Sequence, residues 1–380
     1  MRAYLSEQLI TYIGNKRSLL HTIDAALARV TTRLGRTKLH IWDAFAGSGV
    51  VSRFFKRYSG RLVSNDLELY AKVIGDCYLP NQTDIDFDAL RGHHEHVAKT
   101  AQTLPVRDGF IRRLYAPQRD DAIQLGERVF YTTDNAMRID SMRHAIDSVP
   151  RELQHFLLAP LLAEASVHAN TSGVFKGFYK DAHGVGRFGG HNRDALTRIL
   201  GKIELPFPVF SRFECDVDVR QEDANQLART VGELDVAYFD PPYNQHPYGS
   251  NYFMLNLIVA NQEPRDISAV SGIAQGWQRS SYNKRAHALR TLTDLVEHTP
   301  ASHLIISYNS EGFISRAEFD DLLAKHGRVE VIETKYNTFR GSRNLRGRSI
   351  HVKEQLFLLE RTSKRVRRLP KKSPALHCVS

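Results

Sequence analysis

The stretch Asp240-Pro241-Pro242-Tyr243 has the residue types and spacing of a chemical site. It follows the apolar run 236–239, so we expect it to form the loop at the end of a buried strand. The prolines lack N–H groups, and their carbonyls can accept hydrogen bonds beside the Asp240 carboxylate. Two acceptors and the stacking ring of Tyr243 suit a planar group with an exocyclic amino group, such as the amino edge of adenine. The competing interpretation is a turn that only closes the strand.

A second group of residues, Asp43-x-Phe45-x-Gly47-x-Gly49, stands between an expected strand and an expected helix. Glycine lets the backbone approach a ligand closely, and a helix N-terminus offers N–H groups. A dinucleotide-binding turn requires a third glycine where this chain has Ser52. The acid ahead of the glycines instead suits a ligand with an ammonium group, such as the methionine part of S-adenosylmethionine.

Further polar segments could complete a site for such a ligand. Asp66 ends the next expected strand, where a carboxylate can accept from both ribose hydroxyls. Glu68 is the near alternative, and a helix N-cap is the competing role of Asp66. Asp223 could accept from the amino group of a cofactor adenine, or it is an ordinary loop acid. Three residues of the loop before the first strand could close over an adenosyl group, or form a simple turn: Tyr12, Gly14 and Lys16.

A parallel sheet would bring these segments together. Strand patterns occur at residues 39–42, 61–64, 215–219, 235–239, 303–307, 329–334 and 354–359. Helical patterns occur at residues 50–58, 289–297 and 316–325. This alternation predicts a doubly wound α/β fold. Residues 81–213 differ, because helical patterns there lead into a stretch rich in glycine, lysine and aromatic residues, which fits an inserted domain with a mobile basic loop.

Composition narrows the class of protein. The chain has 380 residues, 42% of them hydrophobic and 25% charged, as in soluble globular proteins. Lysine and arginine outnumber aspartate and glutamate by 52 to 42, a surplus that suggests a polyanionic partner. Part of it lies in a basic tail at 361–380, which is either a solvated end or a nucleic-acid contact. No apolar stretch is long enough to span a bilayer, and no signal-peptide core is present.

Cysteine and histidine spacing gives no metal site. The three cysteines, Cys77, Cys215 and Cys378, are scattered, which fits a reducing cytoplasm rather than a disulfide framework. The run His93-His94-Glu95-His96 lacks the H-E-x-x-H spacing and has no second cluster, so we interpret it as a solvated polar face.

Together these motifs resemble the Dam-like (D12 class) DNA adenine N6-methyltransferases with the α order of motifs. That order is a lysine loop, a D-x-F-x-G-x-G turn, a ribose acid, a target-recognition insert and D-P-P-Y. The resemblance extends past Tyr243 through residues 244–252 and includes the strand end at 307–312. It covers about residues 8–80 and 214–360. The basic tail is a departure that the family does not require.

The resemblance implies a Rossmann-like S-adenosylmethionine-dependent methyltransferase sheet, formed by residues 1–80 and 214–360, with an inserted, mainly helical target-recognition domain at 81–213. It implies S-adenosylmethionine as cofactor and no metal, with Asp240 and the Pro241 carbonyl holding the amino group of a flipped adenine. We expect a set of nine residues at the cofactor: Tyr12, Gly14, Lys16, Asp43, Phe45, Gly47, Asp66, Asp223 and Asp240. We expect four basic residues of the insert near the duplex: Lys176, Lys180, Arg187 and Arg193.

The implied activity is site-specific methylation of double-stranded DNA, as the modification enzyme of a restriction–modification system. A separate cognate restriction endonuclease is a candidate partner, and a bacterial or phage-encoded cytoplasmic protein is expected. Alternatives inside the enzyme class are methylation of cytosine N4, RNA adenine or protein glutamine. Asp240, where serine or asparagine could stand, favours adenine. A non-catalytic DNA-binding regulator on the same fold is the alternative outside that class, and measured methyl transfer separates the two.

Overall fold

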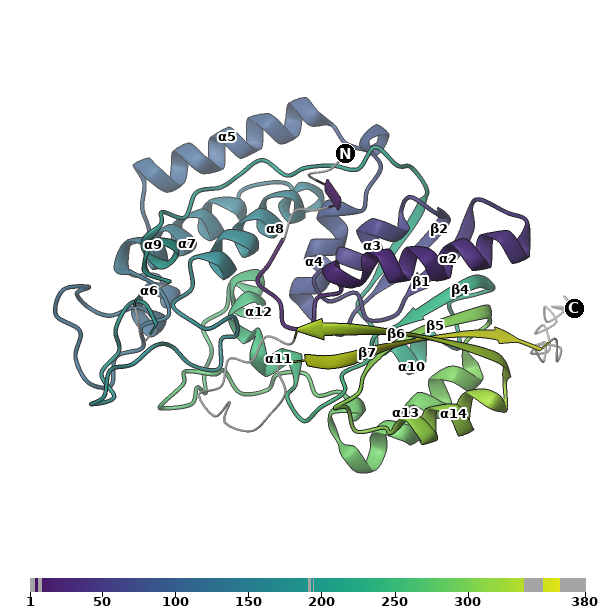
Figure 1. Cartoon of the computed structure of the whole chain (residues 1–380). Coiled ribbons are helices and arrows are strands. Elements are labelled where there is room, and N and C mark those ends of the chain that lie inside the picture. Colours follow the sequence, from purple (N-terminus) through teal and green to yellow (C-terminus); the bar gives the residue numbers. More distant parts are fainter. Residues whose placement is uncertain (1–3, 6–8, 191–192, 194, 338–350, 363–380) are drawn as a thin grey trace, which may run out of the picture.

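The computed structural model describes residues 4–5, 9–190, 193, 195–337 and 351–362. In this part of the chain, strands form a sheet in the order β3-β2-β1-β4-β5-β7-β6 (Figure 1). The strands are β1 (Leu39–Asp43), β2 (Ser59–Asn65), β3 (Asp216–Arg220), β4 (Leu234–Phe239), β5 (Ala301–Asn309), β6 (Gly327–Asn337) and β7 (His351–Arg361). The pairs from β3 to β5 are parallel, whereas β7 runs antiparallel to both β5 and β6. The predicted doubly wound sheet is therefore confirmed.

Helices cover both faces of the sheet because its strands are apolar on both sides. Along β4, Val236 and Tyr238 face one cluster of buried residues, while Ala237 and Phe239 face the other. This alternation follows from the two-residue period of a strand. The first cluster includes helices α2 (Leu20–Leu34) and α3 (Val50–Phe55), and the second includes α10 (Ala224–Leu227), α13 (Arg285–His298) and α14 (Arg316–Ala324). Figure 1 shows the two sets on opposite sides.

The segment expected as an insert is helical, and its helices gather at one end of the molecule (Figure 1). They are α5 (Phe87–Thr103), α6 (Phe110–Tyr115), α7 (Thr133–Ile146), α8 (Arg151–Val167) and α9 (Leu196–Leu200). Buried residues of α7 and α8 share one hydrophobic cluster with α4 (Leu69–Tyr78) and α12 (Phe253–Ala260). The boundaries at residues 81 and 213 remain a prediction, since the core is continuous across them.

A buried arginine ties α7 to α12. Arg143 donates from Nε to the Ile258 carbonyl at 2.8 Å and from Nη2 to the Val259 carbonyl at 3.1 Å. Carbonyls in the last turn of a helix have no partner within that helix. Arg143 also pairs with Asp147 at 2.6 Å. The arginine thus satisfies the end of α12 and fixes α7 against it.

Short helical turns complete the described chain: η1 (Arg17–Leu19), η2 (Gln82–Asp84), η3 (Ser281–Asn283) and α11 (Tyr248–Asn251). None of the helices in the described ranges combines the length and apolar character needed to cross a membrane. Nearly all of the basic tail, residues 363–380, lies outside the described residues.

Candidate active site

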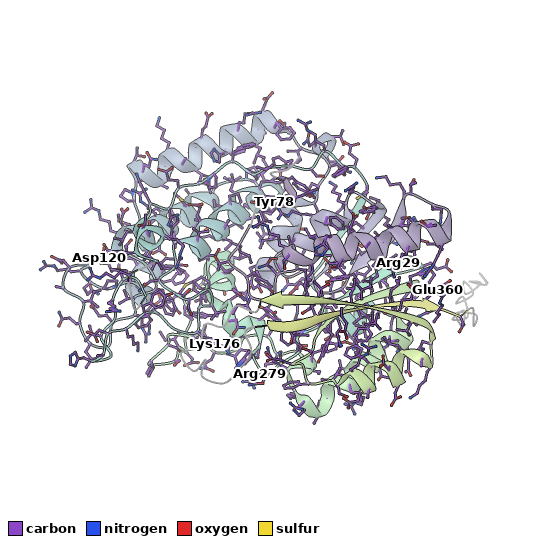
Figure 2. All side chains as sticks on the ribbon, viewed as in Figure 1. Arg29, Tyr78, Asp120, Lys176, Arg279 and Glu360 are labelled. Carbon is purple, nitrogen blue, oxygen red and sulfur yellow. The ribbon has the colours of Figure 1, made fainter. Side chains whose placement is uncertain are left out.

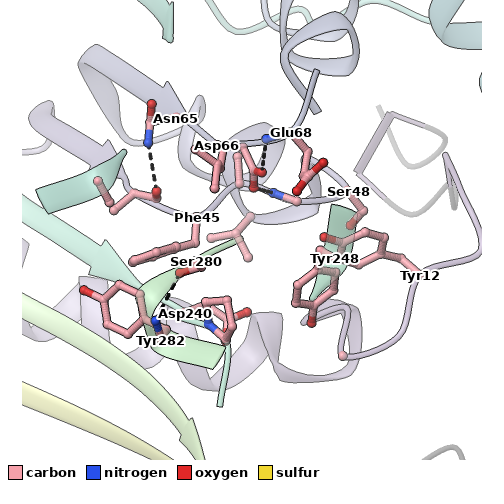
Figure 3. Close-up of a pocket in the computed structure, with 18 of the residues that line it drawn as sticks. Tyr12, Phe45, Ser48, Asn65, Asp66, Glu68, Asp240, Tyr248, Ser280 and Tyr282 are labelled. Atoms are coloured by element: carbon pink, nitrogen blue, oxygen red, sulfur yellow. Dashed lines mark hydrogen bonds between the residues drawn. The ribbon is translucent and has the colours of Figure 1, made fainter. Parts of the chain in front are cut away.

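A cavity of about 850 Å³ opens at the carboxyl edge of the sheet (Figure 3). Segments that follow β1, β2, β3 and β4 line it, together with the loop of residues 12–16. Ligands of open α/β sheets bind at this edge, because the loops after parallel strands converge there. The cavity therefore occupies the place where the sequence motifs were expected to meet.

The glycine turn after β1 is shaped by its neighbours. Gly47 has a φ of +53°, and a Cβ there would lie 2.9 Å from the Tyr12 ring. A side chain at this position would be both strained and crowded. The Gly47 N–H donates to Asp66 Oδ2 at 2.7 Å, and the Glu68 N–H donates to Asp66 Oδ1 at 2.9 Å. Asp66 thus lines the cavity and also holds the turn in place.

Buried carboxyl groups surround the cavity. Burial raises the pKa of Glu68 to about 7, against the opposing effect of a hydrogen bond from Asn256. Burial also raises the pKa of Asp66 above its ordinary value. Asp43 is fully buried behind the cavity and accepts a hydrogen bond from Ser52 at 2.6 Å. Its pKa is raised to about 7, chiefly by burial. Such carboxylates favour a ligand with positive charge.

Aromatic rings form two sides of the cavity (Figure 3). Phe45 meets Tyr282 edge to face, with ring centroids 5.4 Å apart. On the other side Tyr12 stacks on Tyr248 at 5.2 Å. Asp223 also lines the cavity, and its side chain caps α10 by accepting from the N–H groups of residues 225 and 226. Planar and polar parts of one ligand could both be accommodated here.

Asp240 follows β4 and lies in a buried ionic cluster. Lys16 Nζ is 2.9 Å from Asp240 Oδ1 and 3.0 Å from Glu354 Oε1. Burial raises the pKa of Asp240 to about 6, Lys16 lowers it and Glu354 raises it. Burial alone would lower the pKa of Lys16, but the two carboxylates raise it well above its ordinary value. Asp240 therefore has a fixed orientation beside the cavity.

A second cavity, of about 560 Å³, lies beside the loop of residues 240–244. It is lined by Tyr243 and Asn244, and it shares Pro242 and Tyr248 with the first cavity. Tyr243 is held by a hydrogen bond from the Phe313 N–H to its carbonyl at 3.0 Å. The loop thus forms a common wall between the two spaces.

The structure brings together most of the residues expected at the cofactor. Eight of the nine line the first cavity: Tyr12, Gly14, Lys16, Phe45, Gly47, Asp66, Asp223 and Asp240. The ninth, Asp43, lies behind the wall. Pro242 lines both cavities, Tyr243 lines the second, and Pro241 is buried in the loop.

Sequence reasoning missed three residues at the site: two that line the cavities, and Glu354, which pairs with Lys16 in the adjoining ionic cluster. Tyr282 comes from a segment without a motif, and Glu354 comes from a strand for which only a fold role was expected. His246 lies in the stretch that extended the resemblance, but no role was expected for it; it lines the second cavity.

Among the basic residues expected near DNA, one lies at the site. Lys176 lines the second cavity, with Nζ 3.2 Å from His246 Nδ1. Lys180 lies over the Phe178 ring at 4.8 Å. Arg187 donates from Nη2 to the Gly190 carbonyl, which also accepts from the Arg193 N–H. The last three lie in the same segment but line neither cavity.

Comparison with known proteins matches this chain to a family of DNA methyltransferases and to individual methyltransferases. Residues 12–297 match the model of the family described as D12 class N6 adenine-specific DNA methyltransferase. Type II methyltransferase M.NlaIII of Neisseria lactamica is 27% identical over 361 residues, covering 93% of this chain and 100% of that protein. Type II methyltransferase M.CviAII of Paramecium bursaria Chlorella virus 1 is 30% identical, covering 92% and 98% respectively.

Some similar proteins are about twice as long. Modification methylase StsI of Streptococcus sanguinis is 27% identical over 368 residues, which make up 92% of this chain and 52% of that protein. Almost the whole of this chain therefore aligns with about half of that protein.

Proposed function

Because the chain belongs to the D12 class of N6 adenine-specific DNA methyltransferases, we propose that the first cavity binds S-adenosylmethionine and the second cavity receives the target adenine. The class transfers a methyl group to the N6 amino group of adenine in DNA. The observation that carries the proposal is the wall that the two cavities share, Pro242 and Tyr248, with Asp240 beside it. Donor and acceptor could meet across that wall.

The first cavity fits the cofactor by its chemistry. Several acidic residues at or behind its walls, among them Asp43, Asp66, Glu68 and Asp240, suit the sulfonium and ammonium groups. Phe45 offers an aromatic face to the adenine ring. When bound, the cofactor supplies an electrophilic methyl group, so that no metal ion is required.

The second cavity fits a base that has left the double helix. An enzyme that acts on a base must take it out of the stack, and aromatic side chains then pack against it. Tyr243 supplies such a ring at the end of the catalytic loop. Lys176 and His246, also in this lining, suit the phosphates that flank the extruded nucleotide.

Asp240 has the central role in this proposal. Lys16 occupies Oδ1, and Oδ2 would accept a hydrogen bond from the N6 amino group. The bond would orient the nitrogen lone pair toward the methyl donor. The carboxylate charge would offset the positive charge that develops on nitrogen during attack.

Residues 81–213 would read the DNA sequence, since this segment lies outside the sheet and places Lys176 in the lining of the second cavity. The type II names of the relatives support a place in a restriction–modification system, with a cognate endonuclease acting separately.

Long-read sequencing of DNA from a host that expresses the chain tests the function. We expect N6-methyladenine in one short sequence context, and none in a matched culture that expresses Asp240→Asn. The amide keeps the shape but removes the charge, and the rate should fall by roughly a hundredfold or more. Methylcytosine in place of N6-methyladenine, or full methylation by Asp240→Asn, would contradict the proposal.

A further inference from the structure

Glu354 completes an ionic cluster that begins with the catalytic carboxylate. Glu354 Oε1 is 3.0 Å from Lys16 Nζ and accepts a hydrogen bond from Ser307 Oγ at 2.8 Å. Its other oxygen lies 3.4 Å from Asn309 Nδ2. Glu354 and Lys16 are each 4% exposed. A single ammonium group is thus held between two carboxylates, Asp240 and Glu354, and largely shielded from water.

The antiparallel direction of β7 places Glu354 there. In register, Glu354 pairs with Asn309 at the end of β5. A parallel strand would bring its last residues to this edge, whereas β7 brings its first ones. Glu354 and Leu356 are two residues apart on β7, so their side chains point to the same face of the sheet. Leu356 packs on the face that helix α2 covers. Glu354 therefore points toward the same side as Lys16.

The charges of Asp240, Lys16 and Glu354 together determine how well the cluster stabilises a positive charge on the substrate. Lys16 and Asp240 alone would form a neutral pair, and a neutral pair offers little stabilisation to a positive charge that develops beside it. With Glu354 ionised, the cluster carries a net charge of −1. We propose that Glu354 is a positioning residue that neutralises Lys16, so that Lys16 orients Asp240 without cancelling its charge. This inference rests on the methyl-transfer function proposed above.

The acid–base behaviour of Asp240 provides a signature of this role. Glu354 and Lys16 act on the pKa of Asp240 in opposite directions, since Glu354 raises it and Lys16 lowers it. The other titratable groups that face the cluster are Asp43 from β1, Tyr238 from β4, and Tyr243 and Tyr248 from the following loop and helix. Removal of the Glu354 charge should therefore lower the pKa of Asp240, and the acid limb of the rate profile should move to lower pH.

Single-turnover methyl transfer to duplex DNA, measured from pH 5 to 9 with saturating S-adenosylmethionine, tests the inference with Glu354→Gln. We expect a plateau at least about tenfold below wild type and an acid limb at lower pH than wild type. Glu354→Asp keeps the charge, so it should recover most of the rate. Glu360→Gln, at the far end of the same strand (Figure 2), is the matched control and should coincide with wild type.

Several results would overturn the role of Glu354. They are a wild-type plateau in Glu354→Gln, a slower plateau with an unmoved acid limb, and equal impairment of Glu354→Asp and Glu354→Gln. If Glu354→Gln no longer bound the cofactor in calorimetry, or unfolded at the assay temperature, Glu354 would have a structural role and the inference would be rejected. The proposed function is tested separately: if it is wrong, the wild-type protein itself will transfer no methyl group to adenine in DNA.

Discussion

At the scale of single residues, the ionisation of Asp240 should set the lower pH limit of activity. Its pKa is raised to about 6, chiefly by burial. Below that pH the group is protonated and lacks the negative charge that the proposed methyl transfer uses. Activity should therefore rise as pH increases through about 6, instead of near the ordinary aspartate value of about 4. The dependence of kcat/KM on pH measures this limit, and a profile that is flat from pH 5 to 7 would contradict it.

Cofactor binding should release protons at mildly acidic pH. Burial raises the pKa values of Asp43 and Glu68 to about 7, so both are partly protonated in the free protein at pH 6.5. A cofactor with sulfonium and ammonium charges favours the ionised forms and lowers these pKa values. Calorimetry in two buffers of different ionisation enthalpy should therefore give different heats. Glu68→Gln should reduce the difference, and exposed Glu263→Gln should leave it unchanged; equal heats in both buffers for wild type would refute the prediction.

Most of the expected residues that line the first cavity could be predicted to lie together, because they follow parallel strands in sequence and so meet at one edge. The glycine turn and Asp66 are examples. The hydrogen bond between Gly47 and Asp66 could not be predicted from the sequence, because it depends on how the two loops lie in space. The position of Glu354 could not be predicted in this way, because it lies near the start of an antiparallel strand and not after the end of a parallel one. Tyr282 could not be found either, because a lone tyrosine in a loop has no pattern that separates a ligand contact from packing.

At the scale of elements, the contact of α7 with α12 should contribute strongly to stability. Arg143 donates to two carbonyls at the end of α12 and is buried. Arg143→Met would leave those carbonyls without these partners, and the free energy of unfolding should fall by about 2–3 kcal/mol. Arg138 on the same helix also pairs with an aspartate four residues away, but reaches no carbonyl of α12 in the described contacts. Arg138→Met should cost less than about 1 kcal/mol.

Urea unfolding of the two variants measures this difference. Similar losses of stability in Arg143→Met and Arg138→Met would show that the contact with α12 is unimportant. The strands and several helices, such as α3, α13 and α14, were predictable from apolar periodicity. The reversed direction of β7 and the continuous core between the insert and α4 were not, since both depend on contacts between distant parts of the sequence.

At the scale of the whole molecule, the excess of basic residues should appear as salt-dependent DNA binding. The formal net charge is +10, and each phosphate contact that is lost should reduce the slope of log affinity against log salt by about one unit. Lys176→Gln (Figure 2) should weaken binding to all sequences in this way without changing the methylated site.

Fluorescence anisotropy at several salt concentrations measures the slope, and sequencing of methylated DNA reports the site. Lys99→Gln, on α5 and remote from both cavities, is a suitable control. A changed methylation site in Lys176→Gln would mean that this lysine reads a base. Exchange of residues 81–213 for those of a relative should, by contrast, change the site.

The partners of Lys16 have a consequence for the timing of synthesis. Lys16 leaves the ribosome well before Glu354 on β7, because it stands far earlier in the chain. While translation is incomplete, β5 lacks its antiparallel neighbour, and the lysine lacks its second carboxylate. A nascent chain that has reached Tyr282 contains most of the proposed cofactor cavity, and it could bind the cofactor and still fail to methylate. Activity would then begin only after β7 has been added, so that DNA is modified only by molecules that already contain this strand.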